Sequence, residues 1–292
     1  MNKTNNLFMK KVVYVTFLIL VAGNIFVARG IFAEMRPKNL ALYFLDVGQG
    51  DGELIDFGDV QILVDGGKDP KVLSELGRVL TPTDRYIDLV IATHPDLDHF
   101  GGLIDVLKTY EVGAVITTGR RGVADAYSDF ERVIVEKKIP EIKVFAGDEI
   151  KFEDAVIKIL WPTAIAAQGK KVNESGIVFM LEKDGPPGRA GLRALYTADI
   201  GFETEEILAR KYDLDAHILK VGHHGSRFSS EADFLKEVSP AVSVIEVGKN
   251  SYGHPTPSAL GRLASVGSQI FRTDQSGTVK VIFDGDRLKI YD

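Results

Sequence analysis

Residues 93–102 read Thr93-His94-Pro95-Asp96-Leu97-Asp98-His99-Phe100-Gly101-Gly102 and directly follow the apolar run Ile87–Ala92. The apolar run predicts a buried strand. Side chains in a turn after a strand converge just beyond the edge of the sheet. Two pairs could each serve one metal ion here: His94 with Asp96, and Asp98 with His99. A metal at a strand end favours hydrolytic chemistry. The alternative is a polar turn in which Asp98 caps a helix.

Further candidate site residues come after apolar runs later in the chain. They are Asp199, His223, His224 and His254. Asp199 could bridge two metal ions, although an aspartate in this position is by itself more typical of a helix cap. Either His223 or His224 could face the site, with the other supporting it by a hydrogen bond. The alternative for His254 is a histidine of a surface loop.

Two glycine-rich segments also carry aspartates. Asp65-Gly66-Gly67 ends an expected strand, and Asp65 could orient a metal-bound histidine or could belong to a plain turn. Residues 46–52, Asp46-Val47-Gly48-Gln49-Gly50-Asp51-Gly52, look like a phosphate cradle but lack the Lys-Ser/Thr of a P-loop. A nucleoside-triphosphate site is therefore excluded. His217 lies inside an expected strand, and we assign it no role in the site.

Strand-like and helix-like segments interleave after residue 39, which predicts an α/β protein. Strands are expected at Leu40–Val47, Glu53–Phe57, Val60–Val64, Ile87–Ala92, Ala114–Thr117, Ile142–Phe145, Val156–Leu160, Ile177–Leu181, Leu192–Thr197, Ala216–Val221, Val242–Val247 and Thr278–Phe283. Helices are expected at Lys71–Leu80, Leu103–Tyr110, Ala124–Lys138, Thr204–Lys211, Glu231–Val238 and Pro257–Val266.

The N-terminal 36 residues differ in composition from the rest. Three lysines precede an apolar run from Val12 to Ala28, and Arg29 follows it. We expect residues 1–36 to be a membrane anchor or a signal peptide with a short linker, and residues 37–292 to be a separate domain. The lysines place the N-terminus in the cytoplasm, so either alternative exports the remainder. An uncleaved anchor is favoured over cleavage after Ala33.

Composition limits the chemistry of the exported part. The chain has no cysteine, so a metal must be held by His, Asp, Glu or water. Of its 35 Lys+Arg and 41 Asp+Glu, residues 1–36 hold five cations and one anion, which leaves 30 against 40 and a net charge of −10. This charge is unfavourable for a nucleic-acid binder as a whole, although a local basic groove remains compatible with it.

The ordered motifs resemble the metallo-β-lactamase superfamily, whose usual signature is His-x-His-x-Asp-His. Asp96 here replaces the second histidine. With residues 44–51, Asp65-Gly66-Gly67, residues 220–226 and Tyr252-Gly253-His254-Pro255, the chain is similar to the C-terminal hydrolase domain of the ComEC competence proteins and their free-standing relatives. The likeness extends from Leu40 to Phe283.

The resemblance implies a four-layer αββα sandwich in residues 37–292, preceded by the N-terminal hydrophobic segment. It implies two divalent metal ions, Zn²⁺ or Mn²⁺, with the ligands His94, Asp96, Asp98, His99, Asp199 and His254. It implies that His223 or His224 is a further ligand or a general acid, so we expect the catalytic residues to be His223, His224 and Asp98. Where the family has an Asn-rich stretch, this chain has Asn173-Glu174-Ser175-Gly176, which could leave only one metal site occupied.

The expected function is that of a two-metal phosphodiesterase or nuclease acting on DNA or a small phosphodiester outside the cytoplasmic membrane. The localisation expected is a single N-terminal anchor in that membrane, or secretion if the segment is cleaved. One alternative is hydrolysis of a small extracytoplasmic ester, phosphodiester or lactam, and another is a degenerate membrane-tethered binding scaffold. Six cations could meet substrate phosphate or be solvated surface charges: Arg120, Arg121, Lys170, Lys171, Arg227 and Lys249.

Overall fold

The computed structural model describes residues 39–292 except residues 189 and 286. The anchor or signal peptide expected at residues 1–36 lies outside these described residues. Within the described part, no helix combines the length and the apolar composition needed to cross a membrane.

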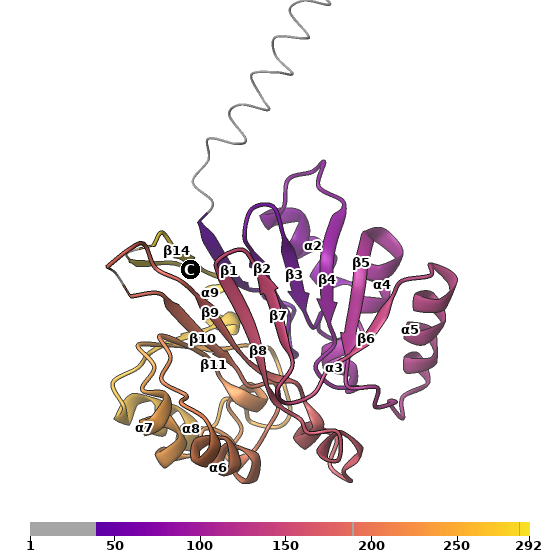
Figure 1. The fold of residues 1–292 in the computed structure, drawn as a ribbon. Coiled ribbons are helices and arrows are strands. Elements are labelled where there is room, and N and C mark those ends of the chain that lie inside the picture. The colour runs from indigo at the N-terminus through magenta and orange to yellow at the C-terminus, as the bar shows by residue number, and fades with distance from the viewer. Residues whose placement is uncertain (1–38, 189, 286) are drawn as a thin grey trace, which may run out of the picture. The chain divides into compact units, whose positions relative to one another are not determined.

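Two mixed β-sheets form the centre of the described part (Figure 1). The first sheet has the strand order β15-β14-β1-β2-β3-β4-β5-β6. Its strands are β1 (Leu40–Phe44), β2 (Glu53–Asp56), β3 (Gln61–Val64), β4 (Tyr86–Ile91), β5 (Glu111–Thr117), β6 (Glu141–Lys143), β14 (Val279–Phe283) and β15 (Leu288–Tyr291). The second sheet has the order β13-β12-β11-β10-β9-β8-β7. Its strands are β7 (Glu149–Phe152), β8 (Ala155–Trp161), β9 (Val178–Lys183), β10 (Leu192–Tyr196), β11 (Ile218–Lys220), β12 (Val242–Ile245) and β13 (Gln269–Arg272).

Half of each sheet is parallel. Strands β3 to β6 run parallel in the first sheet, and β10 to β13 run parallel in the second. Helices connect these parallel strands, because a parallel neighbour needs a crossover. They are α2 (Lys71–Val79), α3 (Leu97–Phe100), α4 (Leu103–Thr109), α5 (Asp125–Glu136), α6 (Phe202–Lys211), α7 (Ala232–Val238) and α8 (Pro257–Ser265). A last short helix is α9 (Thr273–Ser276), and the 3₁₀ turns are η1 (Ala166–Gln168), η2 (Asn173–Ser175) and η3 (Gly222–Gly225).

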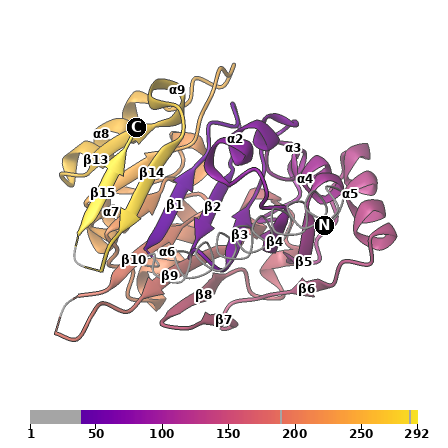
Figure 2. The same cartoon turned by 90° about the horizontal axis from the view of Figure 1, so that it is seen from above.

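Alternating residues along the strands divide the core into three apolar clusters. In β1, Leu42 and Phe44 point into the cluster between the two sheets, whereas Ala41 and Tyr43 point into a cluster covered by α2, α4 and α5. A third cluster joins the outer face of the second sheet to α6, α7 and α8. Figure 2 shows the helices on both outer faces. The four-layer αββα sandwich predicted from the sequence is therefore confirmed.

The sequence missed short elements at the edges. Strands β7, β13 and β15 were not expected, and their residues are largely exposed or half-buried, so no sustained apolar run marks them. Helix α3 begins at Leu97, whereas the sequence predicted a helix only from Leu103. Strand β11 is shorter than expected, so His217 precedes it, and the Nδ1 atom of His217 accepts the backbone N–H of Arg193 at 3.1 Å.

Candidate metal centre

Loops from both sheets meet where the parallel strands end. His94 follows β4, Asp199 follows β10, and His224 lies in η3 after β11. Ligands in α/β folds bind outside the carboxyl ends of such strands. Four non-glycine residues of these turns take positive φ angles: Asp65, Ala198, His223 and His224. Each costs on the order of 1–3 kcal/mol, and such strain gathers at functional sites.

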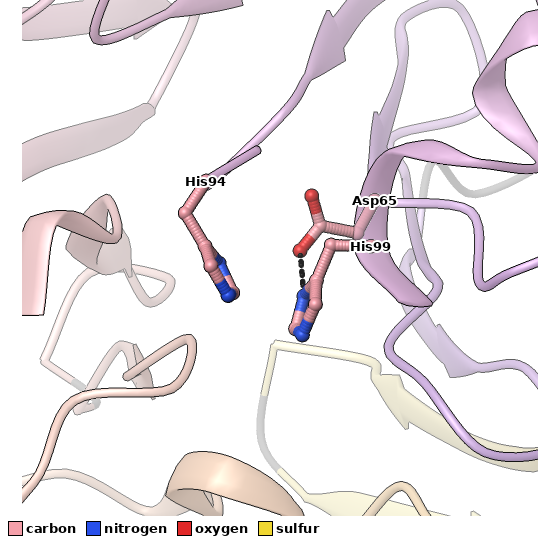
Figure 3. A group of neighbouring side chains, drawn as sticks. All are labelled: Asp65, His94 and His99. Carbon is pink, nitrogen blue, oxygen red and sulfur yellow. Dashed lines mark hydrogen bonds and ion pairs between the residues drawn. The ribbon is translucent and has the colours of Figure 1, made fainter. Parts of the chain in front are cut away.

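Asp65 contacts His99 directly, as Figure 3 shows, and it reaches His94 through Thr93. The Nδ1–H group of His99 donates to the Oδ2 atom of Asp65 at 2.8 Å. The Oγ1 hydroxyl of Thr93 donates to the same carboxylate oxygen at 2.5 Å, and the Nδ1 atom of His94 lies 3.0 Å from that hydroxyl. Because the Nδ1 atoms of His94 and His99 are engaged on this side, their Nε2 atoms are the ones that face the cluster. Of the two alternatives for Asp65, this contact supports the one in which it orients a histidine of the candidate site.

His224, and not His223, points its ring into the cluster. The Nδ1–H group of buried His224 donates to the backbone carbonyl of Glu246 at 2.9 Å. Its Nε2 atom lies 3.4 Å from Asp98 Oδ2 and 3.6 Å from Asp199 Oδ2. The side chain of His223 is 33% exposed, and its Nε2 atom lies 3.3 Å from Asn173 Nδ2.

Asp199 occupies the centre of the cluster. Its Oδ2 atom lies 3.4 Å from His99 Nε2, 3.8 Å from His223 Nε2 and 4.0 Å from His94 Nε2. Together with His224, these make four histidines, and no other carboxylate among the described residues reaches all four. The position agrees with the bridging role that the sequence predicted for Asp199.

Several buried polar atoms at the centre of the cluster lack a hydrogen-bond partner. They are the Nε2 atoms of His94, His99 and His224 and the Oδ1 atom of Asp199. Leaving such a group unsatisfied costs about 1–3 kcal/mol. Three imidazole Nε2 atoms beside carboxylates are, once deprotonated, the donors that bind divalent cations in proteins. The residues present therefore fit the metal ions that the sequence implied.

The electrostatics of the histidines support this interpretation. Burial, reinforced by neighbouring His99, lowers the pKa of His94 to about 3, so its ring is neutral at physiological pH. Burial also disfavours protonation of His224, but the carboxylates of Asp199 and Asp51 outweigh it and raise the pKa of His224 to about 10. In the protein without metal, imidazolium at His224 therefore balances the carboxylates, and binding a cation must release that proton.

Two other predicted ligands lie at the edge of the cluster. The Oδ2 atom of Asp96 is 3.6 Å from His94 Nε2, and its side chain is partly exposed. His254 packs its ring against His223, with centroids 5.5 Å apart. Among the described residues, the groupings of acidic side chains and histidines that could hold a metal include neither Asp96 nor His254. The structure thus brings together His94, Asp98, His99, Asp199 and His224, with Asp96 beside His94 and His254 in contact with His223.

Of the six cations that the sequence offered for binding substrate phosphate, two line cavities at the cluster and four do not. Arg120 donates to the carbonyl of Gly169, and Arg121 pairs with Glu131, so both serve local structure. Lys170 lines a cavity away from the metal cluster, and Arg227 lies over the ring of Phe228. Lys171 and Lys249 line the two cavities that reach Asp199 and Asp98.

A buried ion pair beneath the cluster was missed by the sequence reasoning. Lys220, at the end of β11, contacts Asp51, and both side chains are 1% exposed. The Oδ1 atom of Asp51 lies 3.1 Å from His224 Nδ1. The signal was present in the apolar run Ile218-Leu219-Lys220-Val221, because a lysine in a buried strand needs an anionic partner.

Two packed sheets covered by helices, with a histidine and aspartate cluster at their strand ends, define a class of proteins that bind divalent metal ions at this edge. The family profile described as β-lactamase superfamily domain matches residues 61–262. The chain belongs to this superfamily.

Relatives among competence proteins confirm the finer resemblance. ComE operon protein 3 of Bacillus subtilis is 29% identical over 81% of this chain and 32% of its own length. Recombination protein 2 of Haemophilus influenzae is 29% identical over 89% of this chain and 31% of its own length. Competence protein ComA of Neisseria gonorrhoeae is 28% identical, with coverages of 85% and 33%. The chain spans about a third of the length of these relatives.

Solved structures confirm the fold. The metallo-β-lactamase fold protein YhfI from Bacillus subtilis superposes with a TM-score of 0.56 at 14% identity, covering 83% of this chain and 100% of YhfI. The diiron β-hydroxylase CmlA from Streptomyces venezuelae gives a TM-score of 0.54 at 12% identity, covering 85% and 54%. Because proteins with this fold include a hydroxylase, the fold alone does not select the reaction.

The two adjacent histidines can be separated by experiment. We expect His224→Ala to weaken metal binding about 10–100-fold or more, because it removes a buried Nε2 atom from the donor set. We expect His223→Ala to keep most of the metal and to lower turnover. Metal content after dialysis, measured beside activity, distinguishes them. Equal metal loss in both variants would contradict the assignment of His224 as the inward-facing histidine.

Proposed function

We propose that this chain is a metal-dependent phosphodiesterase that cleaves nucleic acid outside the cytoplasmic membrane. The donor set carries the proposal. The Nε2 atoms of three histidines lie beside the carboxylates of Asp96, Asp98 and Asp199, and the buried carboxylates of Asp51 and Asp65 contact the same histidines. Divalent ions held by this set of nitrogen and oxygen donors would bind the oxygens of a phosphodiester at their remaining coordination positions. Carboxylate-rich ligation also shifts metal preference from Zn²⁺ toward Mn²⁺.

Divalent ions held by these residues would lower the pKa of a bound water and polarise the phosphate oxygens. The protein supplies orientation and a proton. Asp65 and the carbonyl of Glu246 hold the histidine rings in one tautomer, so the Nε2 atoms face the cluster. His223 is exposed to the cavity beside Asp199, and its Nε2–H group can protonate the leaving alcohol. Asn173 can then accept from or donate to His223, because its amide carries both groups.

The relatives support a role in nucleic-acid processing, since they are named as competence and recombination proteins. Export is supported by the sequence alone, through the apolar run from Val12 to Ala28. One observation favours a different substrate: the net charge of −10 in residues 37–292 suits a small ester or phosphodiester better than a long polyanion. For a long polyanion, the charge of the residues that line the site decides binding more than the net charge of the domain does.

Removal of metal tests the reaction class. We expect dialysis of the full chain against EDTA to abolish cleavage of single- and double-stranded DNA and of bis-p-nitrophenyl phosphate. Mn²⁺ should restore it more fully than Zn²⁺, because the ligand set is rich in oxygen. Gel assays and absorbance give the two rates. Cleavage of the small ester alone would select the small-substrate hydrolase, and absence of bound metal and activity would select the binding scaffold.

A further inference from the structure

Two cavities of similar size reach the metal cluster through different residues. One, of about 530 Å³, is lined by Asp199 and His223. The other, of about 550 Å³, is lined by Asp98 and the loop carrying Tyr252. The two share no lining residue. We call them the Asp199 cavity and the Asp98 cavity. Each has the volume of an ordinary ligand site.

The two cavities differ in charge. The Asp199 cavity has one lysine, Lys171, which pairs with Glu203 at 2.8 Å, and Glu174 adds a further carboxylate. The Asp98 cavity has three lysines against two aspartates. Of these lysines only Lys71 has an ion pair within the described part of the chain, with Asp46 at 2.7 Å, whereas Lys68 and Lys249 have none there. Once Asp98 binds a cation, the Asp98 cavity is positive and the Asp199 cavity is not.

An aromatic ring stands at the Asp98 cavity on a rigid loop. Tyr252 is 68% exposed, although a tyrosine usually covers apolar surface. The side chain of Asn250 fixes the loop beneath it. Its Oδ1 atom accepts the backbone N–H groups of Tyr252 and His254, and its Nδ2 group donates to the carbonyls of Gly248 and His254, all at 2.8–3.1 Å. The hydrogen bonds of Asn250 thus fix the backbone that presents the Tyr252 ring at the Asp98 cavity.

We propose that the Asp98 cavity is a nucleotide subsite, in which Tyr252 stacks on the base beside the cleaved phosphodiester while Lys68 and Lys249 contact a flanking phosphate. Stacking on an exposed aromatic ring beside lysines is how single-stranded nucleic acid is held without regard to sequence. The anionic strand extends from the metal cluster over Tyr252, and the Asp199 cavity takes a part of the substrate without a flanking phosphate. This inference rests on the proposed function.

The test uses the full chain and a fluorescent dodecamer of thymidylate. Binding is measured by anisotropy with Ca²⁺ in place of Mn²⁺, so that the cluster is occupied, and cleavage is measured with Mn²⁺. We expect Tyr252→Ala to weaken binding about tenfold, on the scale of one lost base stack, and Tyr252→Phe to bind as wild type. The double variant Lys68→Ala/Lys249→Ala should also lower the slope of log affinity against log salt by about 0.7 for each phosphate that the lysines no longer neutralise.

Two further variants locate the strand. Lys171→Ala, in the Asp199 cavity, should weaken binding much less than the double variant. Lys236→Ala, which removes an exposed lysine of α7, is the matched surface control and should change neither binding nor cleavage. In the Tyr252→Ala variant, kcat/KM for the dodecamer should fall about tenfold more than kcat/KM for bis-p-nitrophenyl phosphate, since a stack is lost only with the nucleotide.

The outcomes separate the subsite from the proposed function. Wild-type binding by Tyr252→Ala and by the double variant, with DNA cleavage intact, would overturn the subsite alone. An equal loss in Lys171→Ala would move the strand to the Asp199 cavity. Binding that depends on Tyr252 without any cleavage would keep the subsite and reject the nuclease. Turnover of the small ester, with neither binding nor cleavage of the dodecamer, would reject both.

Discussion

Asp199→Asn should reduce kcat/KM for a phosphodiester by about 10²–10³-fold, the scale on which loss of one electrostatic stabiliser lowers turnover. The Oδ2 atom of Asp199 lies within 4.0 Å of the Nε2 atoms of His94, His99, His223 and His224. An amide keeps the shape of this side chain but removes its charge, and its NH₂ group cannot bind a cation. Metal binding and activity should therefore fall together.

The measurement compares metal content with steady-state rates. Asp233→Asn is a matched control, because Asp233 is an exposed aspartate of α7 whose carboxylate pairs with neighbouring Lys236, away from the cluster. It should leave both quantities unchanged. Activity of Asp199→Asn within twofold of the wild type would remove Asp199 from the centre of the reaction, whatever its distances.

The turn of histidines and aspartates after β4 was predictable from the sequence because these residues directly follow an apolar strand. An apolar strand followed by His94, Asp96, Asp98 and His99 leaves these side chains few directions other than the sheet edge. The interleaved strand-like and helix-like segments predicted only an α/β protein, and the four layers were implied by the family resemblance. Strand β1 shows why: all five of its residues are apolar and buried, so the sequence does not mark which of them face the second sheet.

The choice between His223 and His224 depends on backbone geometry that side-chain patterns do not encode. Both residues take positive φ angles, 49° and 53°, before Gly225 at 77°. This left-handed turn rotates His224 inward, where the carbonyl of Glu246 holds its ring. Few non-glycine residues adopt such angles. The periodicity of the sequence therefore does not predict which way the side chains of His223 and His224 point. A Gly-rich turn with paired histidines is the only signal available in the chain.

Lys220 and Asp51 were missed because they are far apart in the sequence and meet only in the folded protein. Glu53 and Glu246 lie in the same buried group. Burial, together with neighbouring carboxylates, raises the pKa of Glu246 to about 8 and that of Glu53 well above its usual range. Burial also opposes ionisation of Asp51, but Lys220 and two histidines outweigh it and lower the pKa of Asp51. One carboxylate and one ammonium are therefore balanced beneath the cluster.

This balance makes Lys220→Met the substitution with the largest expected effect on stability. Breaking a buried ion pair costs about 3–5 kcal/mol, because the remaining charge stays buried without a partner. Lys220 Nζ also donates to the carbonyl of Ala198 at 3.3 Å, so the turn that presents Asp199 loses a support. Urea unfolding followed through Trp161, the sole tryptophan, measures the free energy of unfolding.

The double variant Lys220→Met/Asp51→Asn separates charge from packing. If the cost comes from the unpaired carboxylate, removing that charge as well should recover about half of the lost free energy of unfolding or more, and the coupling should lie in the range of about 0.5–3 kcal/mol. Metal affinity should remain about 10–100-fold low in the double variant, since Asp51 also approaches the Nδ1 atom of His224. Lys236→Met, on an exposed face of α7, should change neither quantity. A Lys220→Met protein as stable as wild type would mean that the carboxyl group of Asp51 is protonated in the native protein, and the pair would then have no part in ordering the cluster above it.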